Sequence, residues 1–353
     1  MKVVHLPCYQ DNPYQGLLFD ALRLRGIDAI DGGGGGDFLR SILFRWRPGA
    51  VHFHWLHPYV LRPTAIMSWC RTFRFLLEVL LIRLSGCRII WTLHNLSNHE
   101  GCYPRIEQFA GRWLGKICHH VLCHSNYAAD KAVEVLGICR AKIKVTPHPA
   151  YTHLHANLVE PEIARKQLEL NLQSMVLLFI GRISAYKGVS QLITAFLALA
   201  DENEDLEIVI AGRPQSEEYG NELIKLSQNH PRIHFHLHYI ADEDVSVFFS
   251  AADVVMFPFR QILTSGSVLL AMSFGRACIA PRIGAIPETF PPEQSELTYD
   301  PQVKTGLSET INQAVQQKDN LTAIGAENFR CTETWTWDQL AADCETLYQK
   351  ETR

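Results

Sequence analysis

Residues 181–188 read GRISAYKG, directly after the apolar run Met175–Ile180 and just before the helical pattern of Ser190–Ala200. A short, wholly apolar run of this kind is typical of a buried strand. The glycines of the loop permit a close approach of the backbone, and Arg182 and Lys187 place two cations between a strand end and a helix N-terminus. Cations, free N–H groups and the positive end of a helix together suit a diphosphate. An ordinary polar turn with solvated cations is the alternative interpretation of this loop.

Short apolar runs alternate with helix-length segments on both sides of the loop. Further strands are expected at Lys2–Pro7, Val51–Leu56, Cys87–Thr92, Val121–Cys123, Lys142–Val145, Leu206–Ala211, Val254–Phe257 and Cys278–Ala280. Further helices are expected at Gly16–Arg25, Thr64–Leu84, Asn126–Leu136 and Val268–Phe274. This alternation predicts an α/β fold with parallel, doubly wound sheets.

The alternation breaks at Thr146–Leu168, where three prolines lie among His and Glu, and this break predicts two domains. We expect a Rossmann-like domain at residues 1–150, a linker at 151–168, a second Rossmann-like domain at 169–335 and a C-terminal helix at 336–353. Two such domains imply a cleft between them. Ligands of these sheets bind beyond the carboxyl ends of the strands, so function is expected in the loops that follow the strands.

Length and composition exclude several classes of protein. The chain has 353 residues, 47% hydrophobic and 20% charged, which excludes collagen-like, disordered and small disulfide-scaffold proteins. The net charge is only −4, but residues 1–150 carry 18 Lys and Arg against 10 Asp and Glu, and the remainder carries 15 against 27. No apolar run is long enough to span a bilayer, and ten scattered cysteines fit a reducing compartment. We therefore expect a cytoplasmic protein.

A second polar loop reads Thr264-Ser265-Gly266-Ser267 and precedes an apolar helix. Small residues ahead of a helix can present unpaired N–H groups to an anion. The alternative interpretation is a plain N-cap, for which Ser265 or Ser267 would serve.

These loops belong to an ordered set of motifs that resembles the donor domain of GT-B fold glycosyltransferases of the group 1, family 4-like class. The motifs are Gly181-Arg182 with Lys187-Gly188, Leu206–Gly212, Ala252-Asp253-Val254 with Pro258, Ala271–Arg276, Gly284–Glu288, and Trp337-Asp338 with Leu347-Tyr348. The resemblance implies a GT-B fold, in which the first domain binds the acceptor, the second binds a nucleotide sugar, and the C-terminal segment packs back toward the first domain.

The resemblance also implies a donor site without a cofactor or metal. Its residues would be Gly181, Arg182, Lys187, Gly212, Thr264, Ser265, Gly266, Ser267 and Glu288. Arg182 and Lys187 would be catalytic, because they would stabilise the departing diphosphate where negative charge develops.

One departure concerns two glutamates that the family usually has around the second loop, where this chain has Ile262 and Leu270. In relatives the first glutamate contacts the donor sugar and the second contacts the ribose. Either the Thr264–Ser267 loop takes over their polar contacts, or the donor is held differently, or activity is lost. The class mostly retains anomeric configuration, whereas an inverting route would need a base such as His94, Glu100 or Asp11.

The first half of the chain resembles the family more weakly. The matching segments are Asn12–Leu18, Thr92–Asn95, His124-Ser125 and Pro147–Pro149. The resemblance places His94 nearest the reacting sugar as a catalytic residue, and a satisfied structural histidine is the alternative. The acceptor side would include Asn12, Tyr14, Gly16, His54 and His57.

Three further segments could suggest a metal, and in each we prefer another interpretation. His52 and His54 would share one face of a strand that lines a polar cleft. The Cys and His residues of Cys118–His124 lack zinc-site spacing and fit an alternating strand. The acids of Asp242–Asp244 would open a helix and complement its dipole. A flexible loop is expected at Gly32–Gly36.

Residues 40–88 contain eight arginines, one acid and several aromatic side chains. An anionic membrane surface would attract such a segment, and solvated helix faces are the alternative interpretation. Nothing resembles a nucleic-acid module, so no nucleic-acid partner is expected.

The sequence therefore predicts a glycosyltransferase that moves a sugar from a UDP- or GDP-linked donor to a hydroxyl of a lipid-linked or polysaccharide acceptor. The expected setting is cell-envelope or exopolysaccharide synthesis, in the cytoplasm or peripherally at the inner membrane face. A non-catalytic nucleotide-sugar-binding partner subunit is the main alternative, and an epimerase of the same fold is another.

Overall fold

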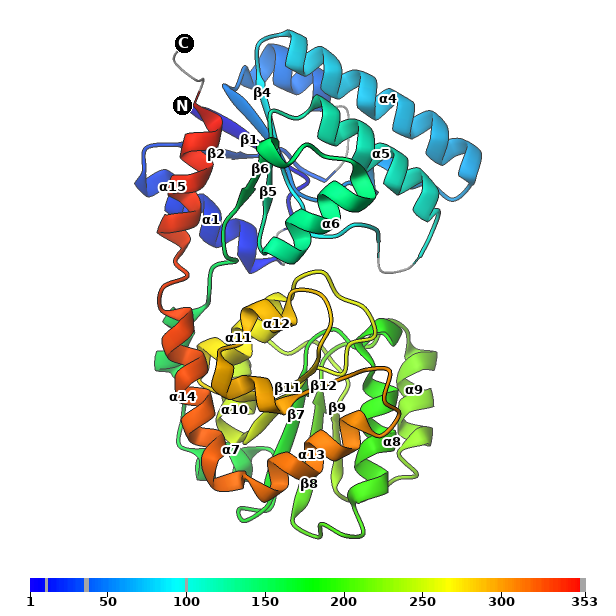
Figure 1. The fold of residues 1–353 in the computed structure, drawn as a ribbon, viewed down its shortest axis with the longest axis vertical. Helices are drawn as coiled ribbons and strands as arrows, with labels where there is room; N and C mark the ends of the chain where they lie inside the picture. Colours follow the sequence, from blue (N-terminus) through cyan, green and yellow to red (C-terminus); the bar gives the residue numbers. More distant parts are fainter. Residues whose placement is uncertain (10–11, 35–37, 99–100, 350–353) are drawn as a thin grey trace. The chain divides into compact units, whose positions relative to one another are not determined.

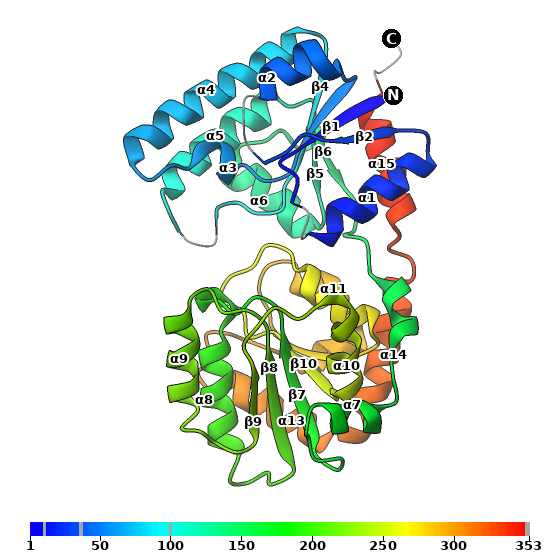
Figure 2. The same ribbon diagram turned by 180° about the vertical axis from the view of Figure 1, so that it is seen from behind.

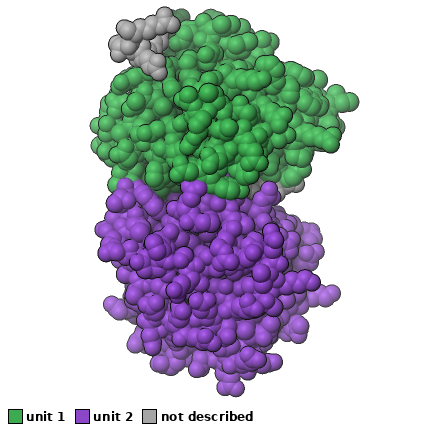
Figure 3. Space-filling model, viewed as in Figure 1, with its two compact units in different colours: residues 1–149, 336–353 green, residues 150–335 purple. Residues whose placement is uncertain are grey.

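The computed structural model describes residues 1–9, 12–34, 38–98 and 101–349, and it divides into two compact units. Unit 1 comprises Met1–Pro149 and Thr336–Arg353, and unit 2 comprises Ala150–Trp335 (Figure 3). Each unit contains a six-stranded sheet in which every described strand pair is parallel. The predicted α/β class with two doubly wound sheets is confirmed.

The sheet of unit 1 has the order β2-β1-β3-β4-β5-β6 (Figure 1). Its strands are β1 (Lys2–Leu6), β2 (Asp28–Asp31), β3 (Ala50–Phe53), β4 (Arg88–Thr92), β5 (His120–Cys123) and β6 (Ile143–Val145). Its helices are α1 (Pro13–Leu24), α2 (Phe38–Arg40), the π-helical turn Ser41–Trp46, α3 (His57–Val60), α4 (Ala65–Leu84), α5 (Pro104–Ile117), α6 (Asn126–Leu136), the 3-10 turn Arg140–Lys142 and α15 (Trp337–Tyr348). Helix α15 packs on α1, and α4 packs on α5 (Figure 2).

The sheet of unit 2 has the order β12-β11-β10-β7-β8-β9. Its strands are β7 (Met175–Ile180), β8 (Leu206–Ala211), β9 (Ile233–His236), β10 (Val254–Met256), β11 (Ala277–Pro281) and β12 (Thr298–Tyr299). Its helices are α7 (Pro161–Gln167), α8 (Val189–Leu199), α9 (Glu217–Leu226), α10 (Asp242–Ala251), α11 (Gly266–Ser273), α12 (Ile286–Thr289), α13 (Gly306–Gln316) and α14 (Leu321–Thr332), with 3-10 turns at Thr152–Asn157, Ala185–Lys187, Pro292–Leu297 and Lys318–Asn320.

The central strands of unit 2 hold its core together. All six residues of β7 and all six of β8 are buried, because helices cover both faces of the sheet. Strands in that position read as continuous apolar runs, and for this reason β7 and β8 coincide with the predicted strands. Helix α8 buries Leu192, Ile193 and Phe196 against them.

The segment 151–168 differs from the expected linker. It forms the 3-10 turn Thr152–Asn157 and α7, and Ala164 is fully buried in the core of unit 2. Arg165 pairs with Asp253 at 2.8 Å, which ties α7 to the start of β10. Pro161, taken from the sequence as a breaker, is the first residue of α7, a position where its missing N–H is not needed.

No helix within the described residues combines the length and apolar character needed to cross a bilayer. All ten cysteines are free thiols.

Candidate functional site

A pocket of about 490 Å³ lies at the carboxyl ends of β7 and β8 in unit 2. Gly181 and Arg182 follow β7, and Gly212 follows β8. Ser267 and Leu270 come from α11 and complete this side of the lining. The pocket is therefore built from the loops where the parallel sheet places its ligand site.

The glycines of these loops serve two different purposes. A Cβ on Gly212 would lie 1.9 Å from the carbonyl oxygen of Gly181, and one on Gly188 would lie 1.8 Å from that of Pro258. These two glycines let loops of the protein touch each other. Gly181 differs, because its Cβ would meet only Ser267 Oγ, at 4.0 Å, so here the backbone faces open pocket space.

Lys187 is a buried cation beside this pocket. Its side chain is 9% exposed, its Nζ lies 3.5 Å from Ser267 Oγ, and it lies 4.8 Å from the centre of the Phe259 ring. Lys187 forms no salt bridge with any described residue. Burial lowers the pKa of Lys187 to about 8. A buried ammonium is costly without an anionic partner, and a ligand diphosphate would supply one.

The predicted donor residues fall into two groups. Gly181, Arg182, Gly212 and Ser267 line the pocket, with Lys187 directly behind Ser267. The others do not line it: Thr264, Ser265, Gly266 and Glu288. Of these, Gly266 is the first residue of α11, and Glu288 is exposed in α12.

Ser265 is the N-cap of α11, because its side chain accepts a hydrogen bond from Val268 N at 3.3 Å. Ser267, the other residue considered for this role, faces Lys187 instead. The N-cap interpretation is confirmed for Ser265, and the binding of an anion by the N–H groups of this loop stays a prediction.

Replacement of Ser265 by alanine is expected to lower the free energy of unfolding by about 1 kcal/mol, the usual cost of a lost N-cap. Thr336→Ala, which removes the N-cap of α15, is the matched control and should cost a similar amount. Urea denaturation measures both. If Ser265→Ala weakened nucleotide binding and left stability unchanged, Ser265 would be a ligand rather than a cap.

Unit 1 gathers histidines at the carboxyl ends of its strands. His5 belongs to β1 and His52 to β3, and the two face each other in the strand register. His54, His94 and His124 come just after β3, β4 and β5. Because parallel strands end at the same edge of the sheet, five histidines from four distant segments meet there.

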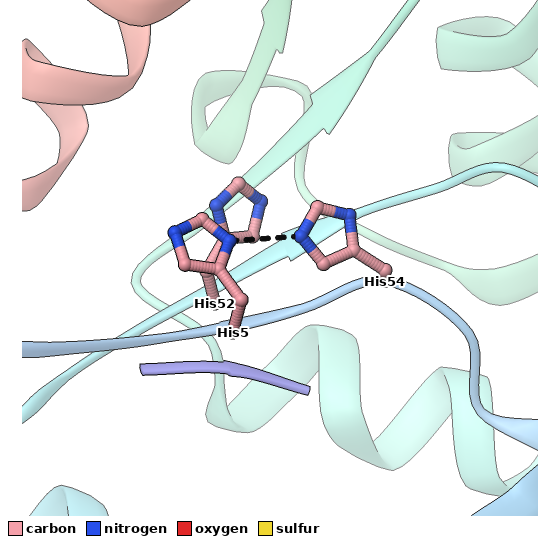
Figure 4. A group of neighbouring side chains, drawn as sticks. All are labelled: His5, His52 and His54. Carbon is pink, nitrogen blue, oxygen red and sulfur yellow. Dashed lines mark hydrogen bonds between the residues drawn. The ribbon is translucent and has the colours of Figure 1, made fainter. Parts of the chain in front are cut away.

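Three of these rings form a hydrogen-bonded chain. His5 Nδ1 lies 3.0 Å from His54 Nε2 (Figure 4), and His54 Nδ1 lies 3.2 Å from His94 Nε2. His5 and His54 are buried, whereas His94 is partly exposed. No described residue bonds His94 Nδ1, so one nitrogen of the outer ring is open.

His52 lies beside this chain but bonds elsewhere. Its Nδ1 lies 2.6 Å from the Tyr348 hydroxyl and its Nε2 lies 2.7 Å from Thr92 Oγ1. Burial lowers the pKa of His52 to about 3, and it lowers the pKa values of His54 and His94 well below 6.5, with neighbouring imidazoles adding to the effect. These rings are therefore neutral at pH 7.

Nitrogen atoms of His5, His52 and His54 lie within 4.8 Å of one another, which is compact enough for a metal ion. Both nitrogens of His52 are already bonded to hydroxyls, and His5 and His54 bond each other directly. We therefore interpret the cluster as a hydrogen-bonded array and assign no metal to it. His52 is covered by Tyr348 of helix α15 and does not line a cleft, whereas His54, although largely buried, lines a small pocket together with Trp55 and His57.

The remaining acceptor-side residues lie around the array. Asn12 caps α1 through a bond from Tyr14 N, and the Tyr14 hydroxyl lies 3.0 Å from His124 Nε2. His57 begins α3 and lies 3.2 Å from the Tyr9 hydroxyl, whereas Gly16 is exposed on α1. Asp11, Glu100, Gly35 and Gly36 lie outside the described residues.

The other segments considered for metals have structural roles. Asp242, Glu243 and Asp244 form the first turn of α10, where their charge complements the helix dipole, although none of them is the N-cap. Cys118 and Cys123 are buried around β5. Within the described residues, no group with metal-site spacing includes either segment.

Seven of the eight arginines of residues 40–88 divide into two sets, and the eighth, Arg71, is half-buried on α4. Arg62, Arg83 and Arg88 donate to main-chain carbonyls of Pro58, Ile117 and Leu347 respectively, so they hold the fold together. Arg40, Arg45 and Arg47 are exposed, as is Arg74, which pairs with Glu78.

Sequence reasoning missed the outer face of α4. Apolar side chains repeat along it at helical spacing and face solvent: Ile66, Phe73, Leu77, Leu80, Leu81 and Leu84. The neighbouring helix α5 exposes Arg105, Arg112, Trp113 and Lys116. The signal was the apolar period of three to four residues; from the sequence, a membrane contact was expected only from the arginines and aromatic side chains of residues 40–88.

Comparisons with known proteins bear on both units. Residues 160–330 match the family described as glycosyl transferases group 1, and residues 34–153 match glycosyltransferase family 4. The GDP-mannose:glycolipid 4-beta-D-mannosyltransferase of Xanthomonas campestris pv. campestris is 26% identical over 277 residues, which cover 78% of this chain and 71% of that protein.

Two solved structures share the fold over nearly the whole chain. Sucrose-phosphate synthase from Thermosynechococcus elongatus has a TM-score of 0.78 at 15% identity, with 98% of each chain covered. Anabaena Alr3699/HepE, in complex with UDP and glucose, has a TM-score of 0.76 at 14% identity and covers 98% of this chain and 99% of its own. At such identities the likeness establishes the fold.

Proposed function

Because this chain belongs to the group 1 glycosyltransferases of GT-B fold, we propose that it transfers a hexosyl group from a UDP- or GDP-linked sugar to a hydroxyl of a lipid-linked or polysaccharide acceptor. One observation carries the donor assignment. Lys187 is a buried ammonium without a salt bridge to the described residues, and its Nζ lies 3.5 Å from the Oγ of Ser267, which lines the pocket at the carboxyl ends of β7 and β8.

The proposed chemistry places the donor diphosphate against Lys187 and Arg182. As the bond between the sugar and the diphosphate breaks, negative charge grows on the departing oxygen, and the two cations stabilise it. Amides at the N-terminus of α11 add to this field, since Gly266 opens that helix beside the pocket. Positive charge supplied by side chains fits a reaction that needs no bound metal.

The class of donor and acceptor is supported by the relatives. A glycolipid mannosyltransferase that uses GDP-mannose is similar to this chain along 78% of its length, and a structural neighbour binds UDP and glucose. We therefore propose a glycolipid or saccharide acceptor of envelope or exopolysaccharide synthesis.

Calorimetric titration with UDP, GDP, UDP-glucose and GDP-mannose tests the donor site. One nucleotide series should bind and the other should not, and Lys187→Met should weaken the binding by about tenfold or more, because one charge-assisted hydrogen bond is lost. Glycosylation of a membrane lipid extract with the bound donor, followed by mass spectrometry, then tests transfer. Absence of binding by every nucleotide would overturn the proposal.

A second candidate concerns the stereochemical course. The family resemblance implies retention, but three observations favour inversion: Leu270 rather than a carboxylate lines the pocket, His94 is a neutral base with an open nitrogen, and the similar mannosyltransferase is named for a β-linked product. The anomeric proton coupling of the first product, compared with that of the donor, distinguishes the two courses by NMR.

A membrane-bound acceptor would require a membrane-facing surface, and we propose the outer face of α4 together with α5. Ile66 is 77% exposed, Leu84 is 74% exposed and Phe73 is 56% exposed, which leaves a continuous apolar stripe in solvent. The only acids of the two helices, Glu78 and Glu107, are buried.

The exposed basic side chains beside the stripe indicate which kind of partner it binds. Arg105, Arg112 and Lys116 lie on α5 with Trp113, and the Lys116 ammonium lies 4.5 Å from the centre of the Trp113 ring. An apolar stripe flanked by cations and an interfacial tryptophan matches the depth profile of an anionic lipid surface. Each cation near such a surface contributes about 1 kcal/mol.

The double replacement Phe73→Ser with Leu77→Ser is expected to weaken binding to anionic phosphatidylglycerol vesicles at least tenfold, because each buried apolar side chain contributes about 1.5–3 kcal/mol. Leu24→Ser is the matched control, since Leu24 is 90% exposed but lies on α1. Vesicle co-sedimentation measures the effect, and phosphatidylcholine vesicles should bind weakly. If the wild type is a dimer and the double variant is a monomer, the stripe binds a second copy of this chain rather than a membrane.

A further inference from the structure

The chain of three imidazoles in unit 1 has a geometry that goes beyond ordinary burial. The ring centres of His5 and His54 are 5.3 Å apart, with planes at 20°, and those of His54 and His94 are 5.5 Å apart, with planes at 23°. Each separation exceeds the corresponding N···N distance of 3.0 or 3.2 Å by about the diameter of one ring. The rings are therefore joined end to end, with each hydrogen bond in the plane of the rings it connects. Figure 4 shows the bond between His5 and His54.

End-to-end bonding couples the tautomers of the three rings. A neutral imidazole carries one N–H and one acceptor nitrogen, and each of the two bonds needs one donor. The chain can therefore exist in only two polarities. In one of them His94 Nε2–H donates to His54 Nδ1 and His54 Nε2–H donates to His5 Nδ1, which leaves His94 Nδ1 as an acceptor. The proton of His5 is then on its Nε2, a buried atom with no hydrogen-bond partner among the described residues. In the other polarity His94 Nδ1 carries the proton.

Burial and the neighbouring imidazoles keep the three rings uncharged. Among the described residues, the titratable groups whose rings contact the three imidazoles or shift the pKa of His94 are His52, His124, His148, Tyr14 and Tyr348. None of them is a carboxylate, a guanidinium or an ammonium. Trp55 stacks on His94 with ring centres 4.5 Å apart and planes at 16°, so the orientation of the outer ring is fixed from the side as well.

We propose that His54 and His5 are positioning residues for His94: they hold it in the tautomer whose Nδ1 can accept a proton, and they share the positive charge that it gains. This inference rests on the proposed glycosyl transfer, in its inverting form. Hydrogen bonds in a row polarise one another, so the inner rings act together rather than singly. They take the place that a carboxylate occupies behind the histidine of a serine hydrolase.

The reaction step balances as follows in atoms and charge. The acceptor oxygen bonds to the anomeric carbon while the bond from that carbon to the diphosphate oxygen breaks, and the electron pair leaves on the diphosphate. The proton of the acceptor hydroxyl moves to His94 Nδ1. His94 becomes an imidazolium whose Nε2–H points at His54 Nδ1, and it returns its proton to water after the product leaves.

Three variants distinguish a catalytic role of the three-imidazole chain from a purely structural one. His54→Asn can keep a polar atom for the bond to His94 but loses the ring that reaches His5. His5→Leu removes the inner end, and His5→Asn restores a polar atom near the position of Nδ1. His52→Asn is the matched control, because His52 is equally buried and adjacent in the strand but bonds to Tyr348 and Thr92.

The pH profile of kcat is the decisive measurement. With the inner rings removed, His94 is a weaker base, so the plateau of kcat should fall about tenfold. The imidazolium also loses stabilisation, so the pKa of His94 falls and the acid limb of the profile moves to lower pH, while KM for the donor is unchanged. His5→Asn should recover most of the rate. His52→Asn should leave the acid limb of the profile at the same pH and the plateau of kcat within about twofold of the wild type.

Several results would overturn the inference. A fall in kcat without movement of the acid limb would show a structural role only, as would the same shift in His52→Asn. A tight one-to-one Zn²⁺ site that His52→Asn removes would assign the rings to a metal. These outcomes need an active wild type, so they are distinct from a failure of the proposed function, in which no donor is transferred at all.

Imidazole ¹⁵N NMR of the full chain gives a readout that does not need turnover. The Nε2-protonated tautomer of His94 should dominate in the wild type, and His54→Phe should redistribute the tautomers because the directing bond is lost. A dominant Nδ1-protonated His94 in the wild type would overturn the inference even if the enzyme were active.

Discussion

Replacement of Lys187 by methionine is expected to lower kcat for sugar transfer by about 100- to 1,000-fold, the usual effect of removing one group that stabilises developing negative charge. Methionine fills the buried volume of the lysine stem but lacks the ammonium that lies 3.5 Å from Ser267 Oγ. Initial rates with saturating donor measure the effect. An exposed lysine of the same unit, Lys304, supplies the control Lys304→Met, which should be silent.

Stability should move differently from activity in the same variant. The folded protein buries the Lys187 ammonium without a carboxylate partner, and an apolar side chain of similar volume removes that desolvation cost. The free energy of unfolding of Lys187→Met should therefore be equal to or greater than that of the wild type. A variant that lost activity and stability together would indicate that Lys187 supports the fold rather than the donor.

The pH dependence of nucleotide binding follows from the lowered pKa of Lys187, about 8 in the free protein. Only the ammonium attracts a diphosphate, so affinity is full below pH 8 and falls by up to tenfold for each pH unit above it. Lys187→Arg stays charged throughout this range, so its affinity should be independent of pH. Calorimetry between pH 7 and 9.5 compares the two proteins.

The sequence predicted the central strands and the edge strand β6, and it missed the other three edge strands, β2, β9 and β12. Met175–Ile180 and Leu206–Ala211 are covered on both faces, so burial demands apolar residues throughout. Asp28–Asp31 is an edge strand with exposed and half-buried positions, and Ile233–His236 is another in which only Ile233 is buried. Such strands need polar residues where they meet water, and their pattern then resembles that of a loop.

The donor loop could be recognised from its motifs, but the roles of its residues required three-dimensional contacts. Gly188 was read as a place for backbone to approach a ligand, whereas it approaches Pro258 from another loop. Ser265 and Ser267 are two residues apart and either could cap α11. Only the contact between Ser267 and Lys187 separates the cap from the pocket residue.

The histidine array lay furthest beyond sequence reasoning. Its bonds depend on strand register, which places His5 opposite His52, and on α15, which brings Tyr348 to His52 from the far end of the chain. Composition was also a poor guide to the arginines of residues 40–88. It could not distinguish Arg88, whose guanidinium donates to the Leu347 carbonyl, from an arginine facing solvent.

Replacement of Gly188 by alanine is expected to lower the free energy of unfolding of unit 2 by more than about 4 kcal/mol, a loss found only for severe steric or polar defects. Gly188 has a φ of 75°, a left-handed conformation that costs other residues about 1–2 kcal/mol. The new Cβ would also lie 1.8 Å from the Pro258 carbonyl oxygen, closer than any non-bonded contact allows. The loops after β7 and β10 would have to separate.

Gly275→Ala in the same unit isolates the steric part of this loss. Gly275 has a φ of 65°, and its Cβ would meet nothing closer than His155 Nε2 at 3.5 Å, an ordinary contact. It should therefore cost only the left-handed conformation, about 1–2 kcal/mol. Urea denaturation with tryptophan fluorescence measures both variants. Equal losses would mean that the loops after β7 and β10 separate at little cost, and the contact that shapes the donor pocket would then be flexible.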